Sequence, residues 1–363
     1  MSKAVNQTST GGLAGKKIFV GLSGGVDSAV TAALLERAGA NVSGVFIKGW
    51  YPPGMPCTWS EDRRDAMRVA AHLRIPFYTL DASEAYRKGV IEYLLREYRA
   101  GRTPNPDIMC NREVKFGAFY AYAREHGADF IATGHYAQVL RTEDDEGVNG
   151  SAELARGVDS EKDQSYFLWA VPKDALDHTL FPLGGMQKSE VRRLAERFGL
   201  PNAKKRDSQG ICFLGNVSVE DFLAQEFGTE PGVAIDADGT KIGTHQGALL
   251  STLGQRVQLQ EAASGPWYVI AKDSAANTLT VAHAPQGSDR NNFVLSEMNW
   301  LQEPTDGAPY TAQYRYHGPK IEGVYDSKAQ TFIPNAPVTE PVAAGQSLVL
   351  YAGDVCLGGG IIE

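Results

Sequence analysis

Apolar and polar positions repeat with two different periods along the first half of the chain. Residues 17–22 (KIFVGL) form a short apolar run that leads into glycines, the pattern of a buried strand. Residues 28–38 then place apolar side chains at helical spacing and stop before Gly39, and residues 42–47 are again strand-like. This order predicts a strand, a glycine-rich turn, a helix and a second strand, which together form a βαβ unit.

The alternation continues towards the middle of the chain. Further strands are expected at 77–80 and 129–133, and further helices at 61–73 (with Ser60 as N-cap), 84–99, 113–126 and 187–199. Strands that alternate with helices predict a parallel sheet that is covered on both faces. Ligands of such sheets bind beyond the carboxyl ends of the strands. Both Ser23–Ser28 and Gly134–His135 fall at such ends.

After about residue 215 the pattern changes to short alternating strands separated by glycine and proline, and from about residue 295 it predicts strands alone. The composition agrees with a globular protein of two or three domains, since 363 residues contain 43% hydrophobic and 21% charged side chains. No apolar run approaches the ~20 residues that span a bilayer. The first seventeen residues lack an apolar signal core and are expected to be a disordered leader.

Cysteine content and charge narrow the picture further. Four cysteines without a CxxC pair predict neither a zinc site nor a disulfide framework. A cytoplasmic protein with reduced thiols is therefore the expectation. The net charge of −8 does not favour a nucleic-acid partner, but local basic patches rather than net charge carry such binding.

The segment Gly21–Ser28 (GLSGGVDS) is the strongest local signal, because it joins a predicted strand to a predicted helix. Its glycines allow the backbone to approach an anion closely, and its serines offer hydroxyl donors. The helix N-terminus adds unpaired N–H groups and a positive dipole end. The string is neither a Walker A loop nor a GxGxxG loop. It therefore predicts a pyrophosphate cradle of another kind.

Two of the four cysteines, Cys110 and Cys212, lie in polar segments with basic neighbours. Pro104 and Pro106 predict an extended loop before the helix that follows Cys110. A nearby helix start and nearby cations both favour the thiolate. A single cysteine of this kind could also be a small buried hydrophobe. That structural interpretation is kept for the other two cysteines of the chain.

Taken together, the motifs resemble those of bacterial tRNA-specific 2-thiouridylases, which belong to the N-type ATP pyrophosphatase (PP-loop) superfamily. The matching strings run in order from residue 21 to 363: GLSGGVDS, RTPNPDIMCNREVKFG, ATGHYA, GVDSEKDQSYFL, DSQGICF, GTHQG, TLGQR and GGGIIE. One departure is Gly49 before Trp50, where the family often has asparagine.

The resemblance implies an α/β fold class. An N-terminal parallel-sheet domain (Rossmann-like, adenine nucleotide alpha hydrolase-like) is followed by a small β-rich central domain and a C-terminal β-barrel. The expected ranges are 1–16 for the leader, 17–215 for the ATP-pyrophosphatase catalytic domain, 216–290 for the central domain and 291–363 for a tRNA-contacting barrel.

The resemblance also implies ATP-dependent 2-thiolation of the wobble uridine in tRNA, with ATP and Mg²⁺ as cofactors and AMP and pyrophosphate as products. The uridine O2 is adenylated, and a persulfide on Cys212 then delivers sulfur to C2. Cys110 is the partner thiol, which closes a disulfide with Cys212 or assists sulfide release. Asp107 is the candidate acid/base group, with a turn-capping role as the alternative. The expected partners are tRNA and a sulfur-donor protein, and the expected oligomeric state is a monomer.

The site residues that the resemblance implies fall into two further sets, and no metal site is predicted. For ATP they are Gly21, Leu22, Ser23, Gly24, Gly25, Val26, Asp27, Ser28, Ile47 and Gly134. For tRNA they are Asn105, Pro106, Asp107, His135, Lys162, Asp163, Gln164, Arg315, Tyr316 and Gln346. Two rival hypotheses stay open: another PP-loop synthetase or ligase that acts without a persulfide, and a nucleotide-binding regulatory module without chemistry.

Overall fold

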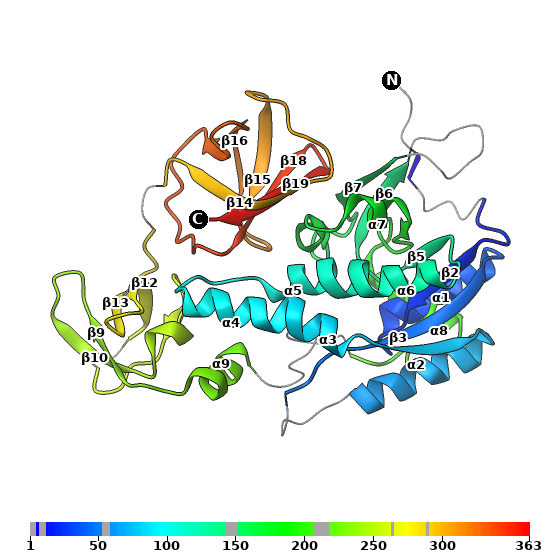
Figure 1. Cartoon of the computed structure of the whole chain (residues 1–363), viewed down its shortest axis with the longest axis horizontal. Helices are drawn as coiled ribbons and strands as arrows, with labels where there is room; N and C mark the ends of the chain where they lie inside the picture. Colours follow the sequence, from blue (N-terminus) through cyan, green and yellow to red (C-terminus); the bar gives the residue numbers. More distant parts are fainter. Residues whose placement is uncertain are drawn as a thin grey trace.

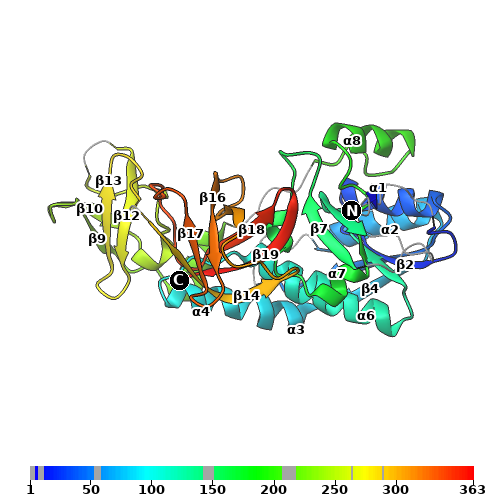
Figure 2. The same ribbon diagram turned by 90° about the horizontal axis from the view of Figure 1, so that it is seen from above.

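The computed structural model describes residues 5–6, 12–52, 59–141, 151–206, 218–262, 265–287 and 290–363. They form three parts, which Figures 1 and 2 show from two directions. The barrel lies between the other two parts along the long axis of the molecule (Figure 2). The part that is central in the sequence is therefore at one end of the structure.

The N-terminal part is built on a five-stranded parallel sheet in the order β4-β3-β2-β5-β8. Successive strands are added outward on one side from β2 to β4, and on the other side from β5 to β8. The direction of winding reverses between β2 and β5, and ligands of such sheets bind at this point. The strands are β2 (Lys17–Gly21), β3 (Asn41–Lys48), β4 (Phe77–Asp81), β5 (Phe130–Ala132) and β8 (Thr179–Leu180).

Helices cover both faces of this sheet, as the alternating pattern predicted. Ile18 and Val20 of β2 pack in one core cluster with α1 (Val26–Arg37), α2 (Trp59–Leu73) and α8 (Lys188–Arg197). Phe19 points to the opposite face and packs with the other helices. On that face lie α3 (Ser83–Tyr86), η1 (Arg87–Ile91), α4 (Glu92–Arg99), α5 (Pro106–Met109), η2 (Cys110–Ala118), α6 (Phe119–Glu125), η3 (Ser165–Leu168) and α7 (Lys173–Asp177).

Two helix starts differ from the expectation. α2 begins at Trp59, so Ser60 lies inside the helix instead of capping it. The helix expected from residue 113 begins at Pro106, because the Asn105 side chain accepts the Asp107 N–H at 3.1 Å and Pro106 occupies the first helical position. Proline therefore starts this helix instead of preceding it in an extended loop, and η2 continues it in π-helical form.

The C-terminal part is a closed barrel, as expected. Its strands run in the order β19-β14-β17-β16-β15-β18, and β18 pairs with β19 to close the ring. The hairpin of β6 (Ala137–Arg141) and β7 (Ala152–Arg156) from the N-terminal part continues this sheet, because Leu154 of β7 pairs with Cys356 of β19. The barrel strands are β14 (Phe293–Trp300), β15 (Pro309–Gln313), β16 (Lys320–Asp326), β17 (Thr331–Pro334), β18 (Ser347–Ala352) and β19 (Val355–Ile362).

The remaining part is a smaller sheet in the order β10-β9-β13-β12-β11. It begins with a helix that the sequence pattern did not predict, α9, whose N-cap Ser218 accepts the Asp221 N–H at 3.0 Å. Its elements are α9 (Val219–Phe227), β9 (Gly232–Ile235), β10 (Lys241–His245), η4 (Ala248–Leu250), β11 (Arg256–Val257), β12 (Trp267–Asp273) and β13 (Thr278–Ala282).

The stretch assigned to a disordered leader, residues 1–16, has structure where it is described. Val5–Asn6 form a two-residue strand, β1, which pairs with β6. Leu13 is buried in the cluster that contains Ile18, because it can remove its apolar side chain from water there. Among the described residues, no helix has both the length and the apolar character that crossing a membrane requires.

Candidate active site

The phosphate loop Gly21–Ser28 turns from β2 into α1, as predicted. Its two hydroxyl groups hold the turn together. Ser23 Oγ lies 3.2 Å from Ser28 Oγ and accepts the Gly25 N–H at 3.3 Å, and Ser28 Oγ also donates to the Gly25 carbonyl at 3.1 Å. No side chain caps α1, whose N-cap is Gly25. The first turn of α1 therefore presents its N–H groups in a way that suits a phosphate.

Two glycines allow other parts of the chain to lie against this loop. Gly24 has a φ of +80°, and a Cβ there would lie 2.4 Å from the backbone oxygen of Asp62 in α2. Gly134 lies directly beyond β5, and a Cβ there would lie 2.8 Å from the backbone nitrogen of Ser28. A larger residue at either position would push its neighbour away. The ends of β2 and β5 therefore meet, as the sequence predicted.

The other residues implied for ATP surround the loop in different ways. Leu22 and Val26 bury their side chains in the core, so only their backbone groups can contact a nucleotide. Ile47, near the end of β3, lies beside Gly21: its Cδ1 is 3.8 Å from the position that a Gly21 Cβ would take. An apolar side chain at this position can pack against an adenine ring.

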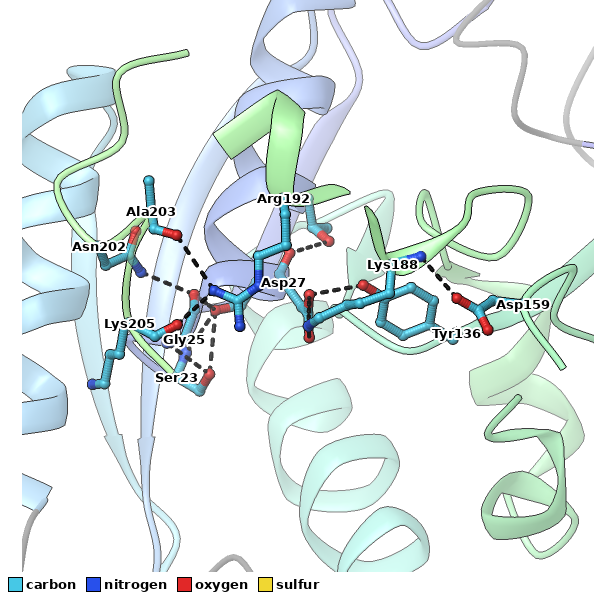
Figure 3. A network of polar contacts seen from close by, with 12 residues as sticks. Ser23, Gly25, Asp27, Tyr136, Asp159, Lys188, Arg192, Asn202, Ala203 and Lys205 are labelled. Atoms are coloured by element: carbon cyan, nitrogen blue, oxygen red, sulfur yellow. Dashed lines mark hydrogen bonds and ion pairs between the residues drawn. The ribbon is translucent and has the colours of Figure 1, made fainter. Parts of the chain in front are cut away.

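The carboxylate of Asp27 is held by two residues that the sequence analysis did not single out (Figure 3). Lys188 at the start of α8 binds both carboxylate oxygens, at 2.7 and 2.8 Å, and the Tyr136 hydroxyl donates to one of them at 2.9 Å. The Lys188 backbone N–H in turn donates to Asp159 at 2.8 Å. This network fixes α8 against the first turn of α1.

The segment 202–206 is also fastened to the phosphate loop (Figure 3). The Asn202 amide donates to the carbonyls of Gly24 and Gly25, at 2.9 and 3.0 Å. Lys205 forms ion pairs with two carboxylates of α2, those of Asp62 and Asp65. Cys212 and the rest of its motif, residues 207–217, lie outside the described residues, so its predicted position beside the loop stays a prediction.

Asp107 and Cys110 lie within one continuous helical segment. Asp107 is half-buried in the first turn of α5, and Cys110 is buried at the first position of η2. Cys110 is therefore one turn further into the helix than the sequence suggested. Cys356, by contrast, lies in β19, where burial raises the pKa of its thiol to about 12, as expected for a structural cysteine.

A contact between Lys115 and His135 links this helix to the end of β5. Lys115 Nζ lies 3.3 Å from His135 Nε2, and Thr133 Oγ1 lies 2.7 Å from His135 Nδ1. Burial, and secondarily the Lys115 charge, hold the pKa of His135 well below its ordinary value, so the ring is neutral at pH 7. Burial raises the pKa of Asp107, and Lys115 opposes this shift. His135 is implied as a tRNA contact, but here it is buried with both ring nitrogens engaged.

Of the three residues of the loop 162–164 that are implied for tRNA, two point their side chains into the protein. The buried carboxylate of Asp163 accepts four hydrogen bonds, from the side chains of Arg156 and Ser165 and from the backbone of Gly157 and Ser165. The Gln164 side chain accepts the Tyr136 N–H at 3.0 Å. These two side chains hold the loop in shape, because a buried carboxylate must be paired. Lys162 is partly exposed on the same loop.

The barrel residues implied for tRNA lie near this loop and near the start of α5. Tyr316 packs against Phe167 with ring centroids 4.5 Å apart. Arg315 is half-exposed and pairs with Glu340 at 2.6 Å. The Gln346 amide donates to the carbonyl of Thr103 at 2.6 Å, just before the proline-rich turn. The fold thus brings Tyr316 against η3 and Gln346 against the turn before α5, although these partners lie far apart in the sequence.

Two of the residues around the phosphate loop that the sequence analysis did not single out have weak sequence signals. Tyr136 directly follows His135 in the ATGHYA string, and Lys188 opens a predicted helix. No sequence pattern shows that Asn202 reaches the phosphate loop, because that contact depends on the packing of α8 against α1. Among the described residues, no group of three or more His, Cys, Asp or Glu side chains could hold a metal ion.

Comparison with known proteins assigns the family. Three family models match consecutive parts of the chain: a tRNA methyl transferase HUP domain over residues 16–216, a tRNA methyl transferase PRC-barrel domain over 220–283 and an aminomethyltransferase beta-barrel domain over 290–362. A tRNA-specific 2-thiouridylase MnmA from Lacticaseibacillus paracasei is 43% identical, covering 96% of this chain and 94% of that protein.

Further relatives agree with this match. A tRNA-specific 2-thiouridylase MnmA from Streptococcus pyogenes is 42% identical over 96% of this chain and 95% of its own length, and one from Streptococcus agalactiae has the same three values. Among solved structures, the U34-tRNA thiolase NcsA from Methanococcus maripaludis is 19% identical, with a TM-score of 0.35 over 59% of this chain and 68% of that one, too low to add to the assignment. The full-length matches confirm what the ordered motifs indicated: the chain belongs to the family of tRNA-specific 2-thiouridylases.

Proposed function

We propose that this protein catalyses the ATP-dependent 2-thiolation of the wobble uridine in tRNA, in the cytoplasm, and releases AMP and pyrophosphate. The observation that carries the proposal is the link between two halves of the site. The helix that bears Asp107 and Cys110 contacts His135 through Lys115. The neighbour of His135, Gly134, lies against the phosphate loop. Nucleotide, base and thiol can therefore meet at the switch point of the sheet.

The first step is adenylation of the base. The target uridine leaves its stack and enters the site, next to Asn105–Asp107. Its O2 attacks the α-phosphorus of ATP, the bond to the β-bridging oxygen breaks, and pyrophosphate leaves. The N3 proton passes to the Asp107 carboxylate. A carboxyl with a raised pKa suits this role, because the best proton acceptor has a pKa closer to the working pH. Mg²⁺ would accompany ATP as its counter-ion and would neutralise charge on the phosphates.

The second step transfers sulfur. The terminal sulfur of a persulfide on Cys212, supplied by a sulfur-donor protein, attacks C2 of the adenylated base, and the proton held by Asp107 returns to N3. The Cys110 thiolate then attacks Sγ of Cys212, and the bond from that Sγ to the transferred sulfur breaks. The electron pair left on the transferred sulfur forms the C2=S bond as the C2–O bond breaks and AMP leaves. A Cys110–Cys212 disulfide remains, and an external thiol must reduce it before the next turnover.

One incubation tests this function. The protein is mixed with ATP, Mg²⁺, a persulfide source and bulk tRNA, and nucleosides are analysed by mass for 2-thiouridine. We expect a product that depends on ATP and is accompanied by AMP. A folded protein that forms no 2-thiouridine would contradict the proposal. Product formation that survives Cys212→Ser would favour a ligase, and ATP binding without AMP release would favour a regulatory module.

We also propose that the barrel grips the tRNA backbone through Arg315. Its guanidinium is half-exposed and pairs with Glu340, a surface ion pair that a phosphate can replace at little cost. Arg315→Ala should raise the KM for tRNA and leave the KM for ATP unchanged. The slope of log Kd against log salt should fall by about one. Lys328→Ala, on the distal β16–β17 turn, is the matched control, and an unchanged salt slope for Arg315→Ala would remove this contact.

A further inference from the structure

Basic side chains gather on α8 and on the segment that follows it. Residues 188–206 contain seven basic and two acidic residues, a net charge of +5, in a chain whose net charge is −8. Like charges one helical turn apart repel each other, so this excess lowers the stability of α8. Four of the basic side chains are exposed and form no ion pair with the part of the chain that the structure describes. We call them the basic patch: Arg193, Arg197, Lys204 and Arg206.

Hydrogen bonds hold the two pieces of the basic patch together (Figure 3). The Arg192 guanidinium on α8 donates to the carbonyls of Ala203 and Lys205, at 3.3 and 2.5 Å. The Asn202 amide fastens the same segment to the phosphate loop. The basic patch is therefore a fixed surface beside the nucleotide site, and its charges keep their places relative to one another.

We propose that the basic patch is the docking surface for the sulfur-donor protein, which meets it with acidic side chains. This inference rests on the proposed function of the site. In the transfer that docking serves, the Cys212 thiolate attacks the terminal sulfur of a cysteine persulfide on the donor. The S–S bond breaks, and the donor's cysteine leaves as a thiolate. The two cysteines must touch, so the donor has to cover the surface around Cys212.

The sequence connects the basic patch closely to Cys212. Arg206 precedes Cys212 by six residues, and six residues span at most about 20 Å. A specific protein interface covers roughly 800 Å² on each partner, so one docked protein can contact both. Opposite charges on the two partners speed their encounter and fix their orientation. A basic surface at this place therefore suits an acidic donor.

The same charges also attract RNA phosphates, but the location of the basic patch favours a protein partner. Val191 of α8 is buried in the core cluster on one face of the parallel sheet. Ile108 of α5 and Tyr316 of the barrel belong to the cluster on the other face. Figure 2 likewise shows α8 apart from the barrel. A donor on α8 therefore leaves the residues implied for tRNA accessible.

The test reverses two charges of the basic patch in the full-length protein, by combining Arg193→Glu with Arg197→Glu. Both side chains lie on α8, one turn apart. The probe is the cysteine desulfurase of the same organism with its sulfur-relay proteins and radiolabelled cysteine, and the transfer of label to Cys212 is timed against a Cys212→Ser blank. We expect a rate about tenfold lower at low salt, because charge reversal slows the encounter. The difference should shrink near about 0.5 M salt, where the charges are screened.

Two controls isolate the docking step. Glutathione persulfide gives up its sulfur without docking, so it should load the variant and the wild type at the same rate. Lys320→Glu combined with Lys328→Glu reverses two exposed lysines on the barrel and should leave loading by the protein donor unchanged. If the charge reversal on α8 prevents folding, Arg193→Gln with Arg197→Gln replaces it and should show a smaller loss in the same direction.

Four results would overturn the inference. The first is a variant that the protein donor loads as fast as the wild type, and the second is an equal loss with glutathione persulfide. The third is a wild type that the protein donor loads no faster than glutathione persulfide does at the same concentration. The fourth, a raised Kd for tRNA with normal loading, would assign the basic patch to RNA. A wild type that accepts sulfur but forms no 2-thiouridine defeats the proposed function instead and leaves the docking surface standing.

Discussion

Replacing Gly134 by alanine should reduce AMP formation to less than about one hundredth of the wild-type rate, a loss of roughly 3 kcal/mol in transition-state stabilisation. The new Cβ would lie 2.8 Å from the Ser28 backbone nitrogen and 2.9 Å from the Asp27 carbonyl carbon. Both atoms are backbone and cannot rotate away, so the first turn of α1 must shift. A displacement of about 1 Å in a positioned site costs on the order of a hundredfold in rate. Single-turnover AMP release with saturating tRNA measures the effect.

A neighbouring glycine provides the comparison. A Cβ at Gly21 would meet its nearest atom, in the Phe119 ring, at 3.6 Å, which is an ordinary contact. Gly21→Ala should therefore lose far less activity than Gly134→Ala, although both residues border the same loop. Equal losses in the two variants, or a nearly active Gly134→Ala enzyme, would show that the close approach of β5 to α1 does not shape the nucleotide site.

The Cys110→Ser enzyme should form 2-thiouridine on the order of a thousandfold more slowly, or not at all, because a serine hydroxyl cannot resolve the persulfide adduct. The adenylation step does not use this thiol, so pyrophosphate release in a single turnover should stay within a few-fold of the wild type. Nucleoside mass analysis and a pyrophosphate assay on the same samples separate the two steps.

Cys356→Ser is the matched control for this variant. Its thiol is buried in β19 with a pKa of about 12, so it is not a nucleophile at neutral pH. The Cys356→Ser enzyme should form 2-thiouridine at the wild-type rate, apart from any loss of folded protein. If Cys110→Ser still thiolated tRNA at a rate comparable to the control, the resolving role of Cys110 would be wrong, and sulfur would have to leave Cys212 by another route.

Most of the N-terminal fold could be predicted because its local signals agree with its packing. The apolar run before Gly21 is predicted as a strand and forms β2, whose alternate side chains are buried on opposite faces of the sheet. The phosphate loop has its own string, in which Gly24 occupies a left-handed conformation. In these places the local sequence determines the structure, so the sequence pattern alone predicts the element.

The sequence was least informative where a residue can play two structural roles. Pro106 fits an extended loop or the first position of a helix, and the Asn105 cap selects the helix. Asp163 and His135 fit a ligand contact or a buried network; both lie in buried networks here, and their contact with tRNA stays a prediction. The contact between Lys115 and His135 gave no sequence signal, because the two residues lie twenty positions apart and tertiary packing brings them together.

The pairing of β7 with β19 joins the N-terminal part and the barrel in one sheet, so the two cannot be separated by a simple truncation. A cut before residue 290 would remove the partner of Leu154 and leave β7 with a bare hydrogen-bonding edge, which invites aggregation. It would also remove Tyr351 from the core that contains Trp169. We therefore expect the first and last thirds of the sequence to unfold as one cooperative unit. If the barrel binds tRNA as proposed, the shared sheet of β7 and β19 would hold that tRNA at a fixed position relative to the N-terminal part.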